Sequence, residues 1–357
     1  MSTSLLRIQA GPGALKHMQN HGLNMADFGY MLAASGGPKW LVLSGLDKYL
    51  CQQHRQAMLG IHGLGTSAGA FRLACYARDD ASQAIDEFAQ QYIATTYSGP
   101  HPRQAERDDS VKQILNTIVM GKEKEILTSQ YMRPHWITAQ CHGLGSVAGS
   151  LPQLVNLIAS MAINRLGRKH LRHLYSRACF GPSNSQLSIT DPFDLPTHYH
   201  PLTANNLYDS LLASGTIPLF SPIRQHIQGA PGSHLDGGLL DYHFDLQLQG
   251  VDSSERPLVL YPHFTHKPRA GWFDKKLQRP PTTSSYDKVV LITPNDAFLS
   301  RLAQGRIPER HDFRVYDNHT RQKAWQHAAD LSQFLAHELH EVIETQDLSQ
   351  IKPLALP

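Results

Sequence analysis

Residues 63–72 read GLGTSAGAFR and place Ser67 between Gly65 and Gly69, directly after the apolar, strand-like run 57–65. The arrangement is the G-x-S-x-G pattern of a nucleophile elbow. A serine in a tight turn between a strand and a helix has strained backbone angles, and small neighbours let the strand and the helix approach closely. Its hydroxyl is expected at the N-terminal end of a helix, where unpaired N–H groups and the helix dipole favour developing negative charge. Taken alone, the stretch also fits a glycine-rich turn with an incidental serine.

Length and composition indicate one large α/β domain. The chain has 357 residues, of which 41% are hydrophobic, and we expect residues 1–357 to form a single domain. The net charge is +3 with His neutral, and no long run carries one sign of charge. Composition therefore gives no argument for nucleic-acid binding.

The chain is expected to be cytoplasmic, with no membrane-spanning segment. Its first residues lack a charged region followed by an apolar one, and no apolar run reaches the length that crosses a bilayer. The cysteines are widely spaced, so the sequence predicts neither a disulfide framework nor a zinc site, and the thiols are expected to be buried and reduced. They are Cys51, Cys75, Cys141 and Cys179.

A second glycine-containing turn precedes the elbow. The apolar run 28–34 predicts a strand, and SGGPKW at residues 35–40 separates it from a helical pattern that continues to about residue 50. Pro38 suits the first turn of a helix, and Gly36 and Gly37 can present free N–H groups to an oxygen anion. An ordinary strand-to-helix turn is the alternative, but a nucleophile elbow about thirty residues later favours an oxyanion hole.

An aspartate motif appears much later in the chain. Asp236 is followed by Gly237 and Gly238 at the end of a β-like run. A side chain there can point into a site while the chain turns sharply away, although Asp-Gly is also a common hairpin turn.

The remaining pattern alternates strands and helices and ends in a long amphipathic helix at about 320–345. We expect residues 267–286 to form a mobile loop, and His337, Glu338 and His340 to be solvated rather than to bind zinc. The other expected strands are 5–9, 135–141, two short runs within 178–190, 257–262, 288–293 and 313–316; the other expected helices are 14–21, 68–77, one capped by Asp80, 110–120 and 201–213.

An apolar segment lies within an inserted helical region at about 150–175. Residues 151–166 are nearly continuously apolar and lead into a basic end that includes Arg165, Arg168 and Lys169. Such a helix could lie on an anionic lipid surface or cover a hydrophobic pocket. It could equally be a core helix with a solvated basic tail.

The glycine turn, the G-x-S-x-G motif and D-G-G occur in an order that resembles the patatin-like phospholipase family. The resemblance spans roughly residues 28–240, and the stretch LASGTIPLF at 212–220 is similar to the family's segment before its aspartate motif. It implies a three-layer α/β/α fold with a mostly parallel central sheet. It also implies a serine acyl hydrolase that cleaves carboxylic ester bonds of lipids or phospholipids, with transient contact with a membrane surface and no metal or organic cofactor.

The resemblance also assigns roles to residues. Ser67 is the implied nucleophile and Asp236 its partner in a two-residue dyad. The implied oxyanion hole comprises Gly36, Gly37, Lys39 and Ala68.

The loop departs from the family pattern at three positions. Ser35 and Trp40 stand where the family usually has glycine, and Pro38 contributes no N–H group. Because one lost oxyanion donor costs roughly a hundredfold or more in rate, these changes put the hole in doubt. Trp40 is expected to pack under the loop.

Two other functions stay open on the sequence. One is an α/β-hydrolase with a Ser-Asp-His triad, and the other is a non-enzymatic lipid-binding or scaffold protein with an impaired oxyanion hole. The triad candidates in the appropriate order are His243, His263, His266 and His311.

Overall fold

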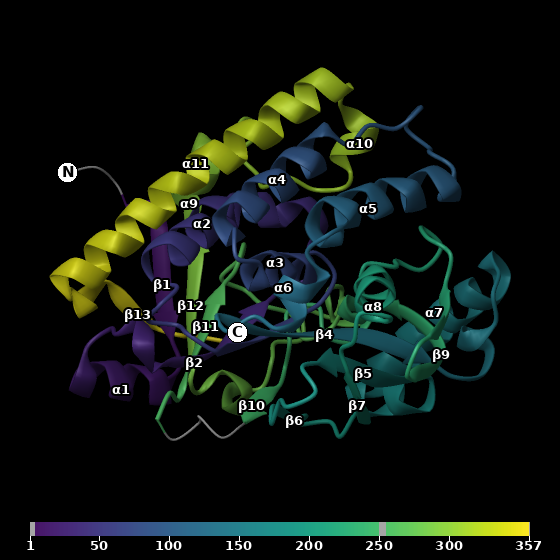
Figure 1. The fold of residues 1–357 in the computed structure, drawn as a ribbon, viewed down its shortest axis with the longest axis horizontal. Coiled ribbons are helices and arrows are strands. Elements are labelled where there is room, and N and C mark those ends of the chain that lie inside the picture. The colour runs from purple at the N-terminus through teal and green to yellow at the C-terminus, as the bar shows by residue number, and fades with distance from the viewer. Residues whose placement is uncertain (1–3, 250–254, 357) are drawn as a thin grey trace.

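The computed structural model describes residues 4–249 and 255–356, and within them an eleven-stranded sheet runs through the molecule (Figure 1). The strand order is β13-β1-β12-β11-β2-β3-β4-β5-β7, with β9 paired to β4 and β8 paired to β9. The strands are β1 (Leu6–Ala10), β2 (Phe28–Ala33), β3 (Ile61–Gly65), β4 (Met132–Cys141), β5 (Tyr175–Gly181), β7 (Thr197–Pro201), β8 (Arg224–Ile227), β9 (Ala230–Asp236), β11 (Leu258–Pro262), β12 (Val289–Pro294) and β13 (Ile351–Pro353). Two short strands, β6 (Ser188–Thr190) and β10 (Gln247–Gln249), pair separately.

The centre of the sheet is parallel. Strands β12, β11, β2, β3 and β4 run in one direction, and antiparallel pairs occur where β1 meets β12 and where β5 and β9 meet β4. The central strands β2, β3, β11 and β12 are buried at every position, as expected for a parallel sheet covered on both faces. The protein is therefore a mixed α/β protein with a mostly parallel sheet flanked by helices, which confirms the predicted fold class.

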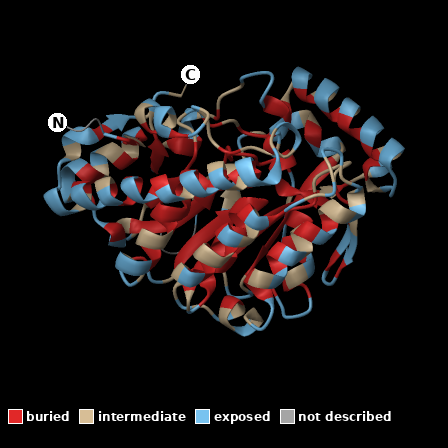
Figure 2. Ribbon diagram, turned by 90° about the horizontal axis from the view of Figure 1, so that it is seen from above, coloured by how far each residue is buried: buried red, intermediate tan, exposed pale blue. Residues whose placement is uncertain are grey.

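Helices α2, α3, α4 and α11 pack together over one side of the sheet, with α11 lying across α2 and α4 (Figure 1). Figure 2 shows buried residues gathered on the central strands and exposed residues on the outer surfaces of the helices. The α-helices are α1 (Pro12–His21), α2 (Ser44–Gln53), α3 (Ala68–Ala77), α4 (Ala81–Ala94), α5 (Gln104–Val119), α6 (Glu123–Leu127), α7 (Ser150–Leu166), α8 (Leu207–Ser214), α9 (Asp296–Arg301), α10 (Asp312–Val315) and α11 (Asn318–Thr345).

Several local expectations were wrong. Residues 313–316, expected as a strand, lie largely in the one-turn helix α10, because Asp312 accepts hydrogen bonds from the Trp325 indole and the Glu309 amide and so fixes a turn. The helix expected from residue 201 begins at Leu207, and Pro201 ends strand β7. Asp80 does not cap α4 with its side chain, because it pairs with Arg78.

The segment 267–286 is also more ordered than expected. It contains two 3-10 turns, Trp272–Asp274 and Thr283–Tyr286, and it buries Phe273, Asp274 and Tyr286. Asp274 accepts hydrogen bonds from Asn164, Arg168 and Arg279, and these bonds anchor the segment to α7 and its following turn.

A buried ion pair joins the helix after the elbow to α2. The Arg72 guanidinium donates to both carboxylate oxygens of Asp47, each at 2.7 Å, and the Tyr76 hydroxyl donates to Asp47 at 3.0 Å. The two side chains of the pair are 1% and 0% exposed, so either charge would be buried without a partner if the other were removed.

We therefore expect Asp47→Ala to lower the free energy of unfolding by about 3–5 kcal/mol, because it leaves the Arg72 charge buried and unpaired. The measurement is equilibrium unfolding in urea. The neighbouring Lys48 pairs with Asp86 at the surface, at 2.8 Å, and provides a matched control. Lys48→Ala should change the free energy of unfolding by less than about 1 kcal/mol. Equal effects of the two substitutions would contradict the assignment of Asp47 to a buried, hydrogen-bonded pair.

Candidate functional site

The predicted elbow lies between β3 and α3. Ser67 has φ 53° and ψ −127°, a strained backbone conformation for a residue with a side chain, and it immediately precedes the first residue of α3. A Cβ atom at Gly69 would lie 1.9 Å from the carbonyl oxygen of Ala33 in β2, and one at Gly65 would lie 2.8 Å from the amide of Ala70. Only glycine therefore allows the strands and the helix to approach this closely.

The sheet brings the ends of β3 and β9 together. Strand β3 pairs with the first half of β4, up to the pair Gly65 and Trp136, and β9 pairs with the second half, beginning at Asp236 and Thr138. Because β5 occupies the other edge of β4, both strands lie on the same edge and run toward each other. Their carboxyl ends meet at Ile137, which lies between the two pairings, and this arrangement places Asp236 beside the elbow.

Hydrogen bonds fix the junction between the two strand ends. The Ser67 amide donates to the Ser214 hydroxyl at 3.0 Å, and that hydroxyl donates to the carbonyl of Ile137 at 2.8 Å. The Asp236 amide donates to the carbonyl of Thr216 at 2.7 Å. The C-terminal end of α8 and the residues after it thus hold both predicted catalytic residues. For this supporting segment the only signal in the sequence was the small-residue stretch at 212–220.

The carboxyl group of Asp236 is buried beside the elbow. Burial raises the pKa of Asp236 to about 6, while the hydrogen bond from the Gly238 amide, the neighbouring Ser67 side chain and the charges of Arg310 and Lys275 act in the opposite direction. The Gly238 bond is 2.7 Å long. A carboxylate with this pKa is a stronger base than an exposed one and is mostly ionised at neutral pH.

The predicted oxyanion loop lies beside the elbow because β2 and β3 are parallel neighbours. Ala33 pairs with Gly65, so the turns that follow the two strands leave the same edge of the sheet. Gly37 has φ 57° and begins a 3-10 helix, and Ala68 begins α3. First residues of helices leave their N–H groups without intrahelical partners, so both amides are available as donors.

The unusual residues of the loop serve packing. Trp40 is 1% exposed and stacks on Phe88 with a ring-centroid distance of 4.1 Å, so it packs under the loop as the sequence predicted. Ser35 is buried against Gly238, where an added Cβ would lie 2.6 Å from the Ser35 hydroxyl. Glycine at 238 therefore allows the loop and the aspartate turn to pack together.

A cavity of about 290 Å³ opens over Asp236. Gly36, Gly37 and Lys39 line it, together with Leu157 from α7. Ser67 is 3% exposed and lies next to the cavity, beside the lining residue Asp236. Sequence analysis missed the other charged lining residues, which come from the segments before α10 and after the turn at 272–274. They are Lys275, Glu309 and Arg310. His311, one of the triad candidates, also lines the cavity.

The histidines considered for a triad lie in different places. His311 is exposed and lines the cavity, whereas His243 and His263 are buried next to each other, with a ring-centroid distance of 4.3 Å. Burial lowers the pKa of both rings. His266 lies on the loop after β11. The pKa of Asp236 depends mainly on its burial, on Gly238 and Ser67, and on the charges of Arg310 and Lys275. No imidazole is among these influences.

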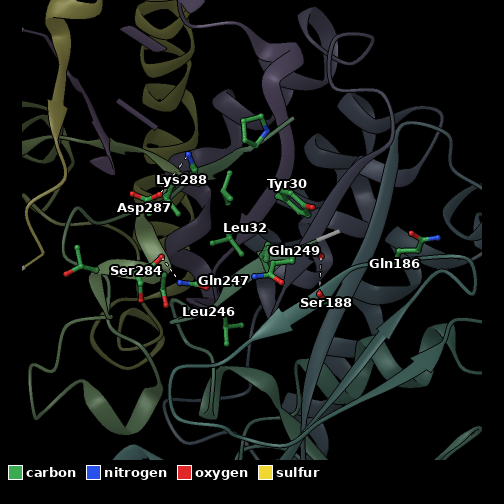
Figure 3. Close-up of a pocket in the computed structure, with 16 residues that line it drawn as sticks. Tyr30, Leu32, Gln186, Ser188, Leu246, Gln247, Gln249, Ser284, Asp287 and Lys288 are labelled. Carbon is green, nitrogen blue, oxygen red and sulfur yellow. Dashed lines mark hydrogen bonds and ion pairs between the residues drawn. The ribbon is translucent and has the colours of Figure 1, made fainter. Parts of the chain in front are cut away.

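A larger cavity of about 950 Å³ lies elsewhere (Figure 3). Its lining includes Asp287 and Lys288, which directly precede β12, and Figure 3 shows them on one side with Gln186 and Ser188 on the other. Pro257, which directly precedes β11, and Tyr30 and Leu32 of β2 also line it, so the cavity lies at the amino ends of β11 and β12 and beside β2. The predicted catalytic residues are at the carboxyl ends, where α/β proteins usually bind ligands.

Helix α7 presents most of its apolar residues to solvent and buries several polar ones. Gln153, Asn156, Ser160 and Asn164 face inward, where the last three hydrogen-bond to Tyr175, to the α7 backbone and to Asp274. The interpretation as an apolar core helix was therefore wrong, and Arg168, expected in a solvated tail, is buried between Asp241 and Asp274. The exposed apolar side chains of α7 are Leu151, Leu154, Val155, Ile158, Met161 and Leu166.

Searches of the described residues found no group of His, Cys, Asp or Glu that could hold a metal ion, and no helix long and apolar enough to cross a membrane. His337 is exposed and pairs with Glu341, and the Glu338 carboxylate accepts hydrogen bonds from the Leu5 and Leu6 amides. The four cysteines are buried free thiols.

Comparisons with known proteins give little. No protein-family model matches the chain, and no curated protein matches it in sequence. Among solved structures, VipD from Legionella pneumophila is similar over 78% of this chain, with 15% sequence identity and a TM-score of 0.28. The chain spans 56% of that VipD chain. Similarity at this level carries no argument about function.

Proposed function

We propose that the protein is a serine acyl hydrolase of the patatin-like phospholipase type, which cleaves carboxylic ester bonds of lipids through Ser67 and Asp236. The observation that supports this most directly is the strained serine at the elbow, because the meeting of the carboxyl ends of β3 and β9 on β4 places it beside the buried carboxyl group of Asp236, whose pKa is about 6. An alcohol is a weak nucleophile until an adjacent base takes its proton, and Asp236 is placed to do so.

The proposed reaction has two halves. Asp236 takes the proton of Ser67 as the serine oxygen bonds to the ester carbonyl carbon, and amides at Gly37 and Ala68 hydrogen-bond the oxyanion. The tetrahedral intermediate collapses, the ester C–O bond breaks, and the proton on Asp236 passes to the departing alcohol. Water then gives a proton to Asp236 as its oxygen attacks the carbonyl carbon of the acyl-enzyme. The second tetrahedral intermediate collapses, the bond to the serine oxygen breaks, the acid is released and Asp236 returns the proton to Ser67.

Labelling with a fluorophosphonate probe tests this proposal, because the probe reacts covalently with an activated serine. We expect one modified residue, Ser67, identified by peptide mass spectrometry, and hydrolysis of short or medium p-nitrophenyl esters by the unlabelled protein. A folded protein that neither reacts with the probe nor hydrolyses these esters would instead support the scaffold alternative.

Contact with an anionic membrane surface is part of the proposed function. The apolar face of α7 is exposed, with Leu154 at 43% and Ile158 at 55%, and exposed Arg165, Lys169 and Arg172 lie at its C-terminal end. An apolar helix face next to cations complements a bilayer with anionic head groups. Leu157 of the same helix lines the cavity over Asp236, so a bilayer on α7 would lie close to the candidate site.

We therefore expect the protein to bind vesicles of phosphatidylglycerol and phosphatidylcholine, with an affinity that falls as salt rises. Replacing both Leu154 and Ile158 with serine should weaken binding about tenfold, because each apolar side chain then contributes less buried area. Vesicle co-sedimentation provides the measurement.

The matched control is Phe334→Ser, since Phe334 on α11 is 52% exposed but far from α7 in sequence. It should leave vesicle binding unchanged. Absence of binding by the wild-type protein at every salt concentration, or equal weakening by the control, would rule out α7 as the docking surface.

A further inference from the structure

Three cationic side chains line the cavity over Asp236. Lys39 follows the glycine turn after β2, Lys275 follows the 3-10 turn Trp272–Asp274, and Arg310 lies just before α10. They come from separate parts of the chain, so no local sequence pattern explains why they share one cavity.

The carboxylates nearest these cations in sequence are committed to other partners. Glu309 pairs with Arg306 at 3.2 Å, and Asp274 pairs with Arg168 and Arg279. Within residues 4–249 and 255–356, none of Lys39, Lys275 and Arg310 lies within 4.0 Å of a carboxylate oxygen in an ion pair. Three cations and two carboxylates, Asp236 and Glu309, line the cavity, so its lining carries one net positive charge when all five groups are ionised.

The cations also interact unfavourably with one another. Desolvation, followed by the charges of Lys39 and Arg310, lowers the pKa of Lys275 to about 8. The pKa of Lys39 is lowered mainly by desolvation, and Glu309 opposes this shift. Like charges held close together are stabilised when an anion binds among them.

Each cationic group has a defined place around the cavity. An added Cβ at Gly37 would lie 3.0 Å from the Nε atom of Arg310, so the guanidinium lies against the oxyanion loop. The Lys275 ammonium lies 3.8 Å from the centroid of the Tyr242 ring, and both residues line the cavity, although Lys275 as a whole is exposed. An anion among them would be close to the position of the reacting carbonyl group.

We propose that Lys39, Lys275 and Arg310 form an anion subsite, and that the ester cleaved at Ser67 carries a phosphate or carboxylate group near its scissile carbonyl. This inference rests on the proposed acyl hydrolase function and specifies its substrate. The cavity volume corresponds to about ten water-sized groups, enough for the anion and a short linker. A longer acyl chain would extend past Leu157 and Trp272, two of the apolar lining residues.

Paired substrates test the subsite. Mono-4-nitrophenyl glutarate and 4-nitrophenyl valerate have the same chain length and differ in a terminal carboxylate, whereas 1-hexanoylglycerol 3-phosphate and 1-hexanoylglycerol differ in a phosphate. For the wild-type protein we expect kcat/KM to be about tenfold or more higher for the anionic member of at least one pair. The preferred pair identifies whether the anion is a carboxylate or a phosphate.

Variants assign the preference to the subsite. Lys275→Gln and Arg310→Gln should each lower the ratio of kcat/KM for the anionic and neutral esters by about tenfold, because a charge-assisted contact is lost. The control is Lys276→Gln, which removes the same charge from the exposed neighbouring residue and should leave the ratio unchanged. A wild-type ratio near one, or a ratio that survives both subsite variants, would overturn the inference while leaving Ser67-dependent hydrolysis intact.

Binding measured without turnover separates this inference from the proposed activity. By isothermal titration calorimetry, glycerol 3-phosphate or glutarate should bind the wild-type protein and bind about tenfold more weakly to Arg310→Gln. If the protein hydrolyses no ester but binds one of these anions through Arg310, the proposed function fails and the anion subsite stands. If neither anion binds, the subsite assignment is wrong.

Discussion

Replacing Ser67 with alanine should lower kcat for p-nitrophenyl esters by about 10⁵-fold or more, because no acyl-enzyme can form without the serine oxygen. The effect should be this large because the remaining groups act through the serine: Asp236 would have no hydroxyl proton to accept, and the amide of Ala68 would have no oxyanion to stabilise, since the ester carbonyl oxygen becomes negative only when the serine attacks. Steady-state kinetics of the purified variant, with mass-spectrometric exclusion of wild-type contamination, provides the measurement.

The fold should survive this change. Ser67 is small and its positive φ is a strained conformation, so Ser67→Ala removes one hydroxyl group and leaves the strain in place. Ser67→Gly should also abolish turnover, and it should raise the stability by up to about 1 kcal/mol because glycine adopts positive φ without strain. Loss of activity with unchanged or higher stability would separate a chemical role from a structural one.

Ser146 provides the matched control. It lies in GLGSVAG at residues 143–149, which echoes the elbow sequence but places the serine directly after a glycine, and its hydroxyl bonds the Gly143 carbonyl. Ser146→Ala should retain full turnover. If Ser67→Ala kept more than about a tenth of the wild-type rate, Ser67 would not be the nucleophile.

The local parts of the site were predictable from the sequence. An apolar run followed by small residues is sufficient to predict β3, the turn and helix 68–77, whose bounds match α3. Asp236 was expected at the end of a β-like run and lies at the end of β9. These features depend on backbone sterics over a few residues, which the local sequence determines.

The long-range features could not be predicted. The meeting of β3 and β9 on one edge of β4 depends on strand register, which is decided by packing across the whole sheet. The lining residues Lys275 and Arg310 come from segments that local pattern assigned to a mobile loop and to the region before a false strand. Buried carboxylates, Asp274 and Asp312, fix these two segments through hydrogen bonds that no periodicity reveals.

The orientation of α7 shows a similar limit. Periodicity identified the helix but not which face is buried, because an apolar face normally packs inward. Here the inward face is satisfied by hydrogen bonds of Asn156 and Asn164 with Tyr175 and Asp274. Hydrogen-bond partners distant in the sequence thus determine which face of α7 is buried.

The second large effect is expected at Asp236. Asp236→Asn should reduce kcat/KM by about 10⁴-fold or more, because an amide cannot accept the Ser67 proton although it keeps the shape of the carboxyl group. In the wild-type protein kcat/KM should rise with pH around a midpoint near 6, as the Asp236 carboxyl loses its proton. Steady-state kinetics from pH 4.5 to 8.5 measures both effects.

The histidines distinguish a dyad from a triad. His311 is the triad candidate that lines the cavity, and in a triad its replacement should cost as much as loss of the serine. For a dyad we expect His311→Ala, and likewise single alanine substitutions of His243, His263 and His266, to leave most of the turnover in protein that remains folded. If one of these histidines proved as necessary as Ser67, the dyad and the patatin-like assignment would both be wrong.

The same aspartate should also affect stability, with a sign opposite to its effect on activity. The folded-state pKa of about 6 lies above the ordinary value of 3.8, so the folded protein binds the extra proton more tightly than the unfolded chain does. The stabilisation from this protonation is fully present below about pH 4 and is lost as pH rises through about 6. By pH 7.5 the free energy of unfolding is therefore about 3 kcal/mol lower from this group than it is below pH 4. Asp236→Asn removes that dependence.

We therefore expect Asp236→Asn to be more stable than the wild-type protein in urea at pH 7.5, and the difference to disappear near pH 4. The hydrogen bond from the Gly238 amide can persist to the asparagine oxygen, so the substitution removes the charge and little else. A variant that is inactive and less stable at pH 7.5 would mean that Asp236 serves the fold. An inactive variant with higher stability at that pH is what a carboxylate kept ionised in a buried site for proton transfer requires.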